Sequence, residues 1–365
     1  MINLVYIGSD IGDITVNAFN AITESDIILN YDDIDLSILD EYIKDKEIIT
    51  TDSDKSKEGD IYSRLEESYS KIEYCVYKSR EDKTVTIVSS NNPNIYTVAN
   101  LLIQISSKHN DIELKIYPGV SPVDYSASLL GAPLNDYAAI DLNNMIVSQE
   151  ELEGKIKSAL ENDFVLFIHN LKGIYGEEEN QNFNLLKRIV NDFNSELLVG
   201  IVNGESHEIC RFKDINDENI NEKTTLIIGN RLTHILDDFM VTSSDYIVKP
   251  KFIEQNMDFF ERYLKGETPR GLDMECDYLP CHKELEACDF CYCPFYPCAD
   301  GVTGGEWIKE KNIWSCQFCD WIHLEDPCLA IREGLDGILE ETEDLKTKHI
   351  ELLKLRRQSL LKTLK

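Results

Sequence analysis

The stretch YPGVSPVDYSASLLGAPLNDYAAIDL, residues Tyr117–Leu142, lies between two series of alternating strand-like and helix-like segments. In each series, short runs of β-branched residues alternate with longer segments of helical periodicity, which is typical of βαβ units. Pro118 and Gly119 mark the point where one series ends and the next begins. The sequence therefore predicts two α/β lobes that meet near these residues, with a crevice between them as the default ligand site.

The first lobe is expected over residues 1–115 and the second over residues 116–248. The first has expected strands at Asn3–Ile7, Asp26–Leu29, Ile48–Thr51, Thr84–Val88 and Glu113–Tyr117, and helices at Thr15–Thr23, Ile61–Tyr77 and Ile95–Ser107. The second has expected strands at Tyr137–Asp141, Asp163–His169, Glu196–Val202, Ile209–Phe212 and Thr224–Ile228, and helices at Pro122–Leu130, Gln149–Glu161 and Asn182–Asn194.

Three further segments are expected downstream of the lobes. An amphipathic linker helix lies within residues 249–272 and ends at GETPRG. A cysteine-rich module follows over residues 273–328. The last segment, residues 329–365, is expected to be one helix, with acids in its first half and bases in its last half, an order that suits the helix dipole.

The composition limits the classes of function. A formal net charge of -31 opposes the binding of nucleic acid phosphates, which depends on neutralisation by Lys and Arg. Hydrophobic residues make up an ordinary 42%, and no run approaches the roughly 18 apolar residues of a membrane span. The start, MINLVYIGSD, is strand-like rather than a signal peptide. We therefore expect a cytoplasmic protein that binds neither nucleic acid nor membrane.

Nine of the eleven cysteines fall between Cys276 and Cys328. In a reducing cytoplasm, clustered cysteines with C-x-x-C spacing are typical of metal ligands rather than disulfides. Zinc is one interpretation, and an iron–sulfur cluster on four of the cysteines is the other. The remaining histidines, His109, His169, His207, His234 and His349, are interpreted as structural. The candidate metal ligands are Cys276, Cys281, His282, Cys288, Cys291, Cys293, Cys298, Cys316, Cys319 and His323.

Two loops of the first lobe have the composition of ligand-binding turns. IGSDIGDIT (Ile7–Thr15) follows the first strand, and its glycines allow the backbone to approach a ligand closely. SSNNPNIYTVA (Ser89–Ala99) follows the fourth strand and contains Asn91 and Asn92, which can adopt turn geometry and donate hydrogen bonds. Either loop alone is a weak signal, because any tight βα turn has a similar composition.

Taken in order, the segments of residues 1–248 resemble the tetrapyrrole methylases, which use S-adenosylmethionine in cobalamin synthesis. Within this family they are most similar to the precorrin-3B (cobalt-factor III) methyltransferases that act at ring carbon 17. The resemblance is carried by TVNAFNAITESDIIL (15–29), IVSSNNPNIYTVA (87–99), Tyr117–Leu142, NDFVLFIHNLKG (162–173), VGIVNGESHE (199–208) and LIIGNRLTHILDDFMVT (226–242). The cysteine segment resembles a small domain attached to cobalamin-synthesis proteins, on CDFCYCPFYPC (288–298), GGEW (304–307), WSCQFC (314–319) and WIH (321–323).

The resemblance implies the family's two-lobed fold, S-adenosylmethionine as the methyl donor in a cleft between the lobes, and a homodimer. It implies a cobalt-precorrin substrate that is methylated with ring contraction. Because the sulfonium donor is already activated, positioning supplies much of the catalysis, and no catalytic residue is assigned. By position in the family motifs, the residues expected to line the donor cleft are Gly8, Asn92, Pro93, Ile95, Tyr96, Gly119, Ser121, Gly229 and Asn230.

The sequence departs from the family around Pro93. Where the family has glycine, aspartate and further glycines, this chain has Asn91, Asn92, Asn94 and Thr97, so side chains stand where bare backbone approaches the donor. This leaves a second hypothesis open, a non-catalytic tetrapyrrole- or metal-binding accessory protein of the same pathway.

Overall fold

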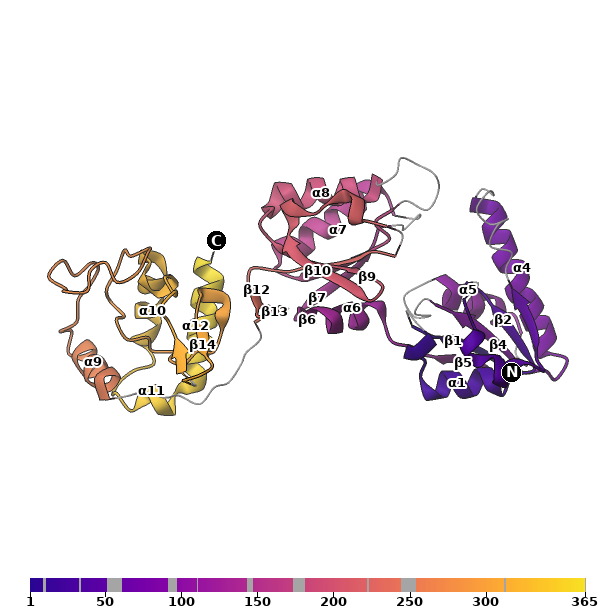
Figure 1. Ribbon diagram of the computed structural model, residues 1–365, viewed down its shortest axis with the longest axis horizontal. Helices are drawn as coiled ribbons and strands as arrows, with labels where there is room; N and C mark the ends of the chain where they lie inside the picture. Colours follow the sequence, from indigo (N-terminus) through magenta and orange to yellow (C-terminus); the bar gives the residue numbers. More distant parts are fainter. Residues whose placement is uncertain are drawn as a thin grey trace. The chain divides into compact units, whose positions relative to one another are not determined.

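The β-branched runs of the first lobe form a parallel sheet in the computed structural model of the chain (Figure 1). The structure describes residues 1–8, 11–32, 34–50, 61–90, 97–109, 111–142, 147–172, 181–221, 223–243, 254–311 and 313–364. Two units, Met1–Leu129 and Leu130–Lys365, each have their own internal packing and are taken in turn.

Unit 1 has five parallel strands in the order β3-β2-β4-β1-β5. The strands are β1 (Ile2–Tyr6), β2 (Ile27–Asn30), β3 (Glu47–Thr50), β4 (Val85–Ser89) and β5 (Leu114–Tyr117). The helices are α1 (Val16–Thr23), α2 (Asp40–Ile43), α4 (Ile61–Ser79), α5 (Thr97–Ser106) and α6 (Pro122–Leu130). Helix α1 begins where the Thr15 hydroxyl accepts a hydrogen bond from the Ala18 amide at 3.3 Å.

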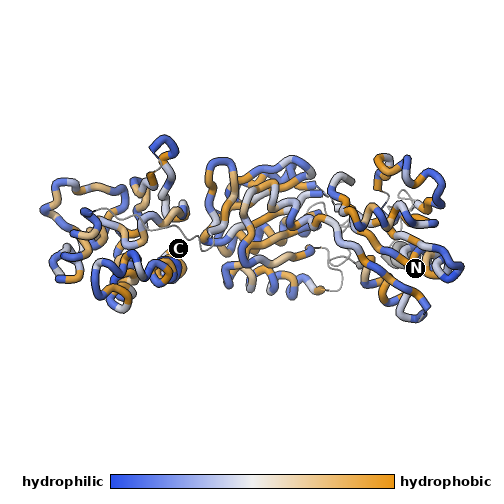
Figure 2. Tube along the Cα trace, turned by 90° about the horizontal axis from the view of Figure 1, so that it is seen from below, coloured by the Kyte–Doolittle hydropathy of each residue, from blue (hydrophilic) through white to orange (hydrophobic). Residues whose placement is uncertain are grey.

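Helices cover both faces of this sheet, which explains why its central strands are fully buried and mostly apolar. Leu4 packs on one face with residues of α4 and α5, whereas the next residue, Val5, packs on the other face with residues of α1 and α2. In Figure 2 the apolar colour accordingly concentrates on the strands and the inward sides of the helices. This two-sided burial makes the sheet doubly wound and agrees with the βαβ units predicted for the first lobe.

Unit 2 begins with a mixed sheet in the order β10-β9-β11-β8-β7, in which only β7 and β8 run parallel. The strands are β7 (Tyr137–Asp141), β8 (Val165–His169), β9 (Leu198–Asn203), β10 (Ser206–Arg211) and β11 (Thr225–Ile228). Helices α7 (Gln149–Glu161) and α8 (Gln181–Asn194) pack on one face through Ile156, Phe183 and their neighbours. On β9, a Cβ at Gly200 would lie 2.3 Å from the Leu130 side chain, so glycine makes room for this leucine.

A second, three-stranded sheet was not predicted from the sequence. It consists of β6 (Gly131–Ala132), β12 (Thr233–Leu236) and β13 (Phe239–Thr242), in the order β12-β13-β6. Strands β12 and β13 form a hairpin whose turn has Asp237 at φ 53°. These strands are too short to show a clear alternating pattern.

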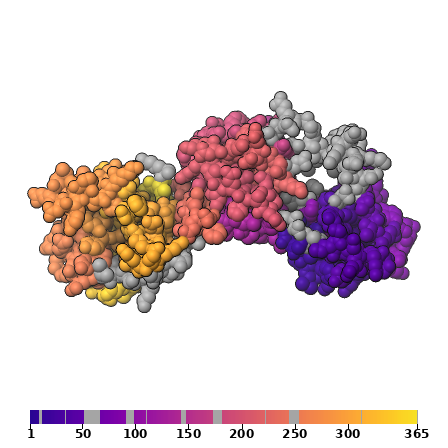
Figure 3. All heavy atoms as spheres, in the orientation of Figure 1, coloured from indigo at the N-terminus to yellow at the C-terminus, as the bar shows by residue number. Residues whose placement is uncertain are grey.

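The cysteine segment packs into one hydrophobic cluster with helices on either side of it. Phe259 and Phe260 of α9 (Glu254–Leu264) are buried in this cluster, so α9 is an element of it rather than a free linker. Hairpin β14 (Glu306–Ile308) and β15 (Ile313–Ser315) supplies the buried Trp314. In Figure 3 the orange atoms of the cysteine segment form most of the visible face here, with yellow atoms of the C-terminal helices at its margins.

The segment expected as a single final helix forms three helices instead. They are α10 (Glu325–Leu335), α11 (Asp344–Thr347) and α12 (His349–Thr363). The Asp344 carboxylate accepts hydrogen bonds from the Glu340 and Glu341 amides at 2.8 and 3.2 Å, which fixes the turn between α10 and α11. Gly334 lets Leu355 of α12 contact α10, because a Cβ there would lie 2.1 Å from the leucine side chain.

Candidate functional site

Gly8 and the Gly119–Ser121 segment lie together at the carboxyl edge of the parallel sheet, where α/β proteins bind ligands. They follow the adjacent strands β1 and β5. Gly8 has φ 82°, and a Cβ on it would lie 3.6 Å from the Val120 carbonyl oxygen. Ser121 accepts a hydrogen bond from the Val123 amide at 3.2 Å and so fixes the start of α6. Of the other predicted donor residues, Asn92, Pro93, Ile95 and Tyr96 lie outside the described residues.

Two carboxylates at this edge were not identified from the sequence. The Asp32 carboxylate accepts hydrogen bonds from the Ser89 hydroxyl at 2.7 Å and the Ser90 amide at 2.9 Å, which fixes the end of β4. Asp13 lies beside Gly8, and its Oδ2 atom is buried without a hydrogen-bond partner in the described part of the chain. A buried, unsatisfied carboxylate oxygen next to bare backbone suits a polar or cationic ligand group.

Gly229 and Asn230 form the turn after β11. A Cβ on Gly229 would lie 2.5 Å from the Thr233 side chain, so the turn requires glycine there. The Asn230 side chain donates to the Asp163 carbonyl oxygen at 2.8 Å and accepts from the Leu232 amide at 2.9 Å. The structure thus gives Asn230 a role in its own turn, and its contact with a donor stays a prediction.

In the second lobe, Asp141 and His169 are register partners at the carboxyl ends of the parallel strands β7 and β8. Asn170, at φ 59°, donates a hydrogen bond to Asp141 Oδ1 at 2.7 Å. His169 Nδ1 lies 3.9 Å from the same oxygen, and the imidazole is buried. His169 was expected to be structural because no ligand-like partner lies near it in the sequence, whereas its pairing with Asp141 depends on strand register.

We expect His169 to make the second lobe less stable as the pH falls. Burial lowers the pKa of His169, and the Asp141 charge and a hydrogen bond with Asn170 oppose this only in part. The folded-state pKa therefore lies below the unfolded value of about 6.5. The contribution of His169 to the free energy of unfolding is fully present above about pH 6.5. It is lost as the pH falls toward the folded-state pKa, because the unfolded state then binds more protons than the folded state.

Urea unfolding of the wild type and His169→Gln, each at about pH 5.5 and about pH 7.5, measures this effect. The variant is expected to lose less stability between the two pH values than the wild type. His207→Gln, at an exposed position on β10, serves as the control and should behave as the wild type does. Equal losses in wild type and His169→Gln would contradict the prediction.

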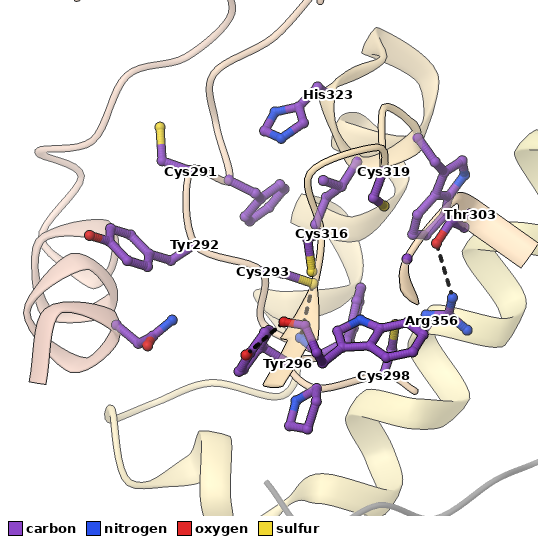
Figure 4. Close-up of a pocket in the computed structure, with 18 of the residues that line it drawn as sticks. Cys291, Tyr292, Cys293, Tyr296, Cys298, Thr303, Cys316, Cys319, His323 and Arg356 are labelled. Carbon is purple, nitrogen blue, oxygen red and sulfur yellow. Dashed lines mark hydrogen bonds between the residues drawn. The ribbon is translucent and has the colours of Figure 1, made fainter. Parts of the chain in front are cut away.

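Seven of the ten candidate metal ligands line a cavity of about 620 Å³ in the cysteine-rich segment. Cys291, Cys293, Cys298, Cys316 and Cys319 line it, as do both candidate histidines. Figure 4 shows the Cys293 and Cys316 side chains pointing toward one another. A hydrogen bond of 3.1 Å from the Cys319 amide to the Cys316 carbonyl oxygen closes the turn between these two cysteines. Within the described part of the chain, no three Cys, His, Asp or Glu side chains already converge as a metal-binding group.

Four of these thiols interact electrostatically as one group. Burial raises the pKa of Cys293 well above its ordinary value, and the charges of Cys298, Cys316 and Cys319 raise it further. Burial, followed by the charges of Cys298 and Cys319, likewise raises the pKa of Cys316 to about 12. A bound cation would relieve this mutual repulsion, so the donor set fits a metal.

A different set of thiols affects the pKa of Cys291. Desolvation raises the pKa of Cys291, and the charges of Cys288, Cys276 and Cys281 add to the effect. Cys288 Sγ accepts a hydrogen bond from the Asp273 amide at 3.4 Å. The cysteines of the candidate list thus fall into two groups of four.

The two candidate histidines stack on each other, with ring centroids 4.1 Å apart. His323 is buried, and its Nδ1 lies 3.3 Å from the Ala287 carbonyl oxygen. Burial and then the neighbouring His282 lower the pKa of His323 to about 4, so it is neutral at physiological pH. His282 Nδ1 lies 3.4 Å from Asp320 Oδ1.

A buried ion pair lies beside the first thiol group. Arg356 of α12 donates to Asp300 Oδ2 at 2.5 Å, and both side chains are nearly buried, at 8% and 12% exposed. Asp300 also accepts from the Ser243 hydroxyl at 2.6 Å and the Val302 amide at 3.1 Å. Burial opposes ionisation of Asp300, but the Arg356 charge and these hydrogen bonds outweigh it and lower the pKa. In the sequence, Arg356 is distinguished only as one of several basic residues near the end of the chain.

Comparisons with known proteins cover both parts of the chain. The family described as Tetrapyrrole (Corrin/Porphyrin) Methylases matches residues 2–191, and the family described as Cysteine-rich small domain matches residues 270–346. A protein of Methanothermobacter thermautotrophicus named "Probable cobalt-factor III C(17)-methyltransferase" is 34% identical over 99% of this chain and 100% of its own length. A protein of Methanocaldococcus jannaschii with the same name is 31% identical over 50% of this chain and 77% of its own length.

A solved structure supports the fold. The crystal structure of the methyltransferase CobJ matches with a TM-score of 0.55 at 18% identity, over 66% of this chain and 99% of that structure. A doubly wound parallel lobe followed by a mixed five-stranded lobe therefore defines an α/β protein of the methylase fold, as predicted. The chain belongs to the tetrapyrrole methylases, and a cysteine-rich small domain follows its methylase part.

Family membership confirms the prediction of a methyltransferase and does not favour the accessory-protein hypothesis. Among the helices of the described residues, none is both long and apolar enough to span a bilayer.

Proposed function

We propose that the protein transfers a methyl group from S-adenosylmethionine to carbon 17 of cobalt-factor III or precorrin-3B, with ring contraction, in cobalamin biosynthesis. The observation that carries this proposal is the match of both the methylase part and the cysteine-rich part to one relative of that name over its entire length. In the transfer the carbon–sulfur bond of the sulfonium breaks and a carbon–carbon bond to the macrocycle forms. The products are S-adenosylhomocysteine and the methylated ring.

The edge of the parallel sheet supplies the features that such a donor needs. Gly8 presents backbone without a side chain, and Asp13 presents a buried carboxylate oxygen beside it. A carboxylate there can accept hydrogen bonds from the amino group or the ribose of the donor. We therefore assign Asp13 to donor binding, with Gly8, Gly119 and Ser121.

Asp13→Asn is expected to weaken the binding of S-adenosylmethionine by about 10- to 100-fold, because a hydrogen bond to a charged group contributes roughly 1.5–3 kcal/mol. Asp124→Asn, an exposed position on α6 in the same unit, is the matched control and should bind as the wild type does. Calorimetric titration of the three full-length proteins measures the effect. Equal affinity in wild type and Asp13→Asn would remove Asp13 from the site.

Activity is tested by anaerobic incubation of the full-length protein with cobalt-factor III and S-adenosylmethionine carrying a ¹³C-labelled methyl group. The label should appear in the macrocycle together with an equal amount of S-adenosylhomocysteine. Donor binding without transfer would argue for another tetrapyrrole substrate. Failure to bind the donor at all would favour the non-catalytic accessory role.

We also propose that the cysteine-rich module carries zinc or an iron–sulfur cluster, supported by the two groups of thiols that raise one another's pKa. His282 and His323 remain candidate ligands on the same cavity. We further propose a cytoplasmic homodimer that does not bind nucleic acid. Reduced thiols require a reducing compartment, and the net charge of -31 opposes phosphate.

A further inference from the structure

Arg231 lies in the turn after β11 and connects this turn to the last turn of α12. Its Nη1 atom donates to the Leu361 carbonyl oxygen at 2.9 Å. The last four carbonyls of a helix have no partner within the helix, and a cation beside them also suits the helix dipole. A side chain of the second lobe thus caps α12, although 130 positions separate the two residues in the sequence.

The same guanidinium is held on its other side by Asp163, which precedes β8. The Arg231 amide and the Arg231 Nε atom both donate to Asp163 Oδ1 at 3.2 Å. The Asp163 carbonyl oxygen accepts from the Asn230 side chain at 2.8 Å. The planar guanidinium can reach Asp163 and Leu361 at once, which a single ammonium group cannot do as well. Asp163 therefore fixes Asn230 and Arg231 together.

A second route connects the same turn to α12 through Leu232. The Ser243 amide donates to the Leu232 carbonyl oxygen at 3.2 Å, and the Ser243 hydroxyl donates to Asp300 Oδ1 at 2.6 Å. Asp300 is the buried partner of Arg356 on α12. Two successive residues of the turn, Arg231 and Leu232, are therefore linked to one helix by separate routes.

Polar contacts, rather than apolar packing, dominate where the turn faces α12. The turn and α12 both line a cavity of about 310 Å³, with Asn230, Arg231 and Leu361 among its walls. A cavity of this size with mainly polar walls can take up water, so packing would not replace hydrogen bonds lost from Arg231. A further ion pair between the second lobe and the module, Lys309 with Asp237, is exposed at 73% and 61% and contributes little.

From these contacts we infer that Arg231 is a positioning residue of the methyl-donor site, through which α12 holds the turn of Gly229 and Asn230 in place. The inference rests on the proposed function and on the predicted contact of this turn with S-adenosylmethionine. Arg231 acts through Asn230 and takes no part in the bond changes. Because α12 packs in the hydrophobic cluster of the cysteine-rich module, the module supports the donor site rather than acting as an independent appendage.

Arg231→Gln removes the charge and the connection between Asp163 and Leu361. In calorimetric titration of the full-length protein, the variant should bind S-adenosylmethionine roughly 3- to 30-fold more weakly, the range found for residues that couple two parts of a protein. The KM for the donor should rise by a similar factor while kcat changes by less than about 2-fold, because binding rather than chemistry is affected. Arg231→Lys should recover part of the affinity, since one of the two acceptors stays within its reach.

The matched control is Lys309→Gln, which breaks an ion pair between the module and the second lobe that does not involve this turn. It should bind the donor as the wild type does. Equal affinity in the wild type and Arg231→Gln would overturn the inference while leaving the proposed function intact. Equal weakening in Arg231→Gln and Lys309→Gln would also overturn it, because the effect would then not be specific to the turn.

Hydrogen exchange without donor tests the connection to α12 independently of methyl transfer. In Arg231→Gln, the amides of residues 229–233 and 355–364 should both exchange faster than in the wild type, and in Lys309→Gln neither segment should change. Unchanged exchange in Arg231→Gln would overturn the role of α12. Failure of the wild type to bind S-adenosylmethionine would count against the proposed function as well as the positioning role, and the exchange data would still decide whether Arg231 joins the turn to the helix.

Discussion

Arg356→Met is expected to destabilise the module by roughly 3–5 kcal/mol, because it leaves the buried Asp300 carboxylate without its charge partner. Methionine keeps much of the side-chain volume, so the loss reports on charge rather than on a cavity. All three tryptophans of the chain, Trp307, Trp314 and Trp321, belong to this module. Tryptophan fluorescence during urea unfolding therefore measures its stability without a signal from the lobes.

The control for this prediction is Lys354→Met, which removes a positive charge from an exposed position of the same helix. It should change the free energy of unfolding by no more than about 0.5 kcal/mol. Combining Arg356→Met with Asp300→Asn should cost less than the sum of the two single changes, since no unpaired buried charge remains. Strict additivity would show that the two side chains do not act as a pair.

The sequence was sufficient to predict the strands of the first lobe because both faces of its sheet are buried. Leu4 and Val5 pack on opposite faces, so most of the run is apolar and can be recognised without the structure. The hairpin around Asp237 could not be predicted in this way. Its strands have four residues each, and an aspartate at positive φ makes the turn in place of a glycine.

The expected final helix shows a different limit. Helical periodicity continues through residues 329–365, but it does not reveal where the chain turns back on itself. The Leu355 side chain packs on Gly334 and so holds α12 against α10. These two residues are far apart in the sequence, so a periodic pattern cannot reveal their contact. Tertiary packing therefore overrides a local preference for one long helix.

The candidate metal ligands were identified from spacing, whereas their grouping required the structure. Cys291 and Cys293 are two residues apart, yet their charged neighbours belong to different sets of thiols. Arg356 and Trp314 carry no spacing signal, because they approach the sulfurs from a helix and a hairpin. In the methylase part, the pairing of His169 with Asp141 likewise depends on the register of β7 and β8.

Gly119→Ala is expected to destabilise unit 1 by roughly 3 kcal/mol, because a Cβ at this position would lie 2.4 Å from the Tyr6 carbonyl oxygen. Main-chain atoms cannot move aside as a flexible side chain can, so β1 and β5 would have to separate. Gly154→Ala on α7 is the matched control, since a Cβ there meets nothing within 4 Å. Alanine should stabilise that helix by roughly 0.5–1 kcal/mol.

Far-UV circular dichroism and tryptophan fluorescence, followed together in one urea titration, separate the effects of these changes. Gly119→Ala should shift part of the dichroism transition to lower urea and leave the fluorescence transition of the module where it is in the wild type. Because Gly119 and Gly8 share one edge of the sheet, the same variant should also weaken binding of S-adenosylmethionine under conditions where the lobe is still folded. Unchanged dichroism would mean that the strands can absorb the extra methyl group, and the crossover would then not require glycine.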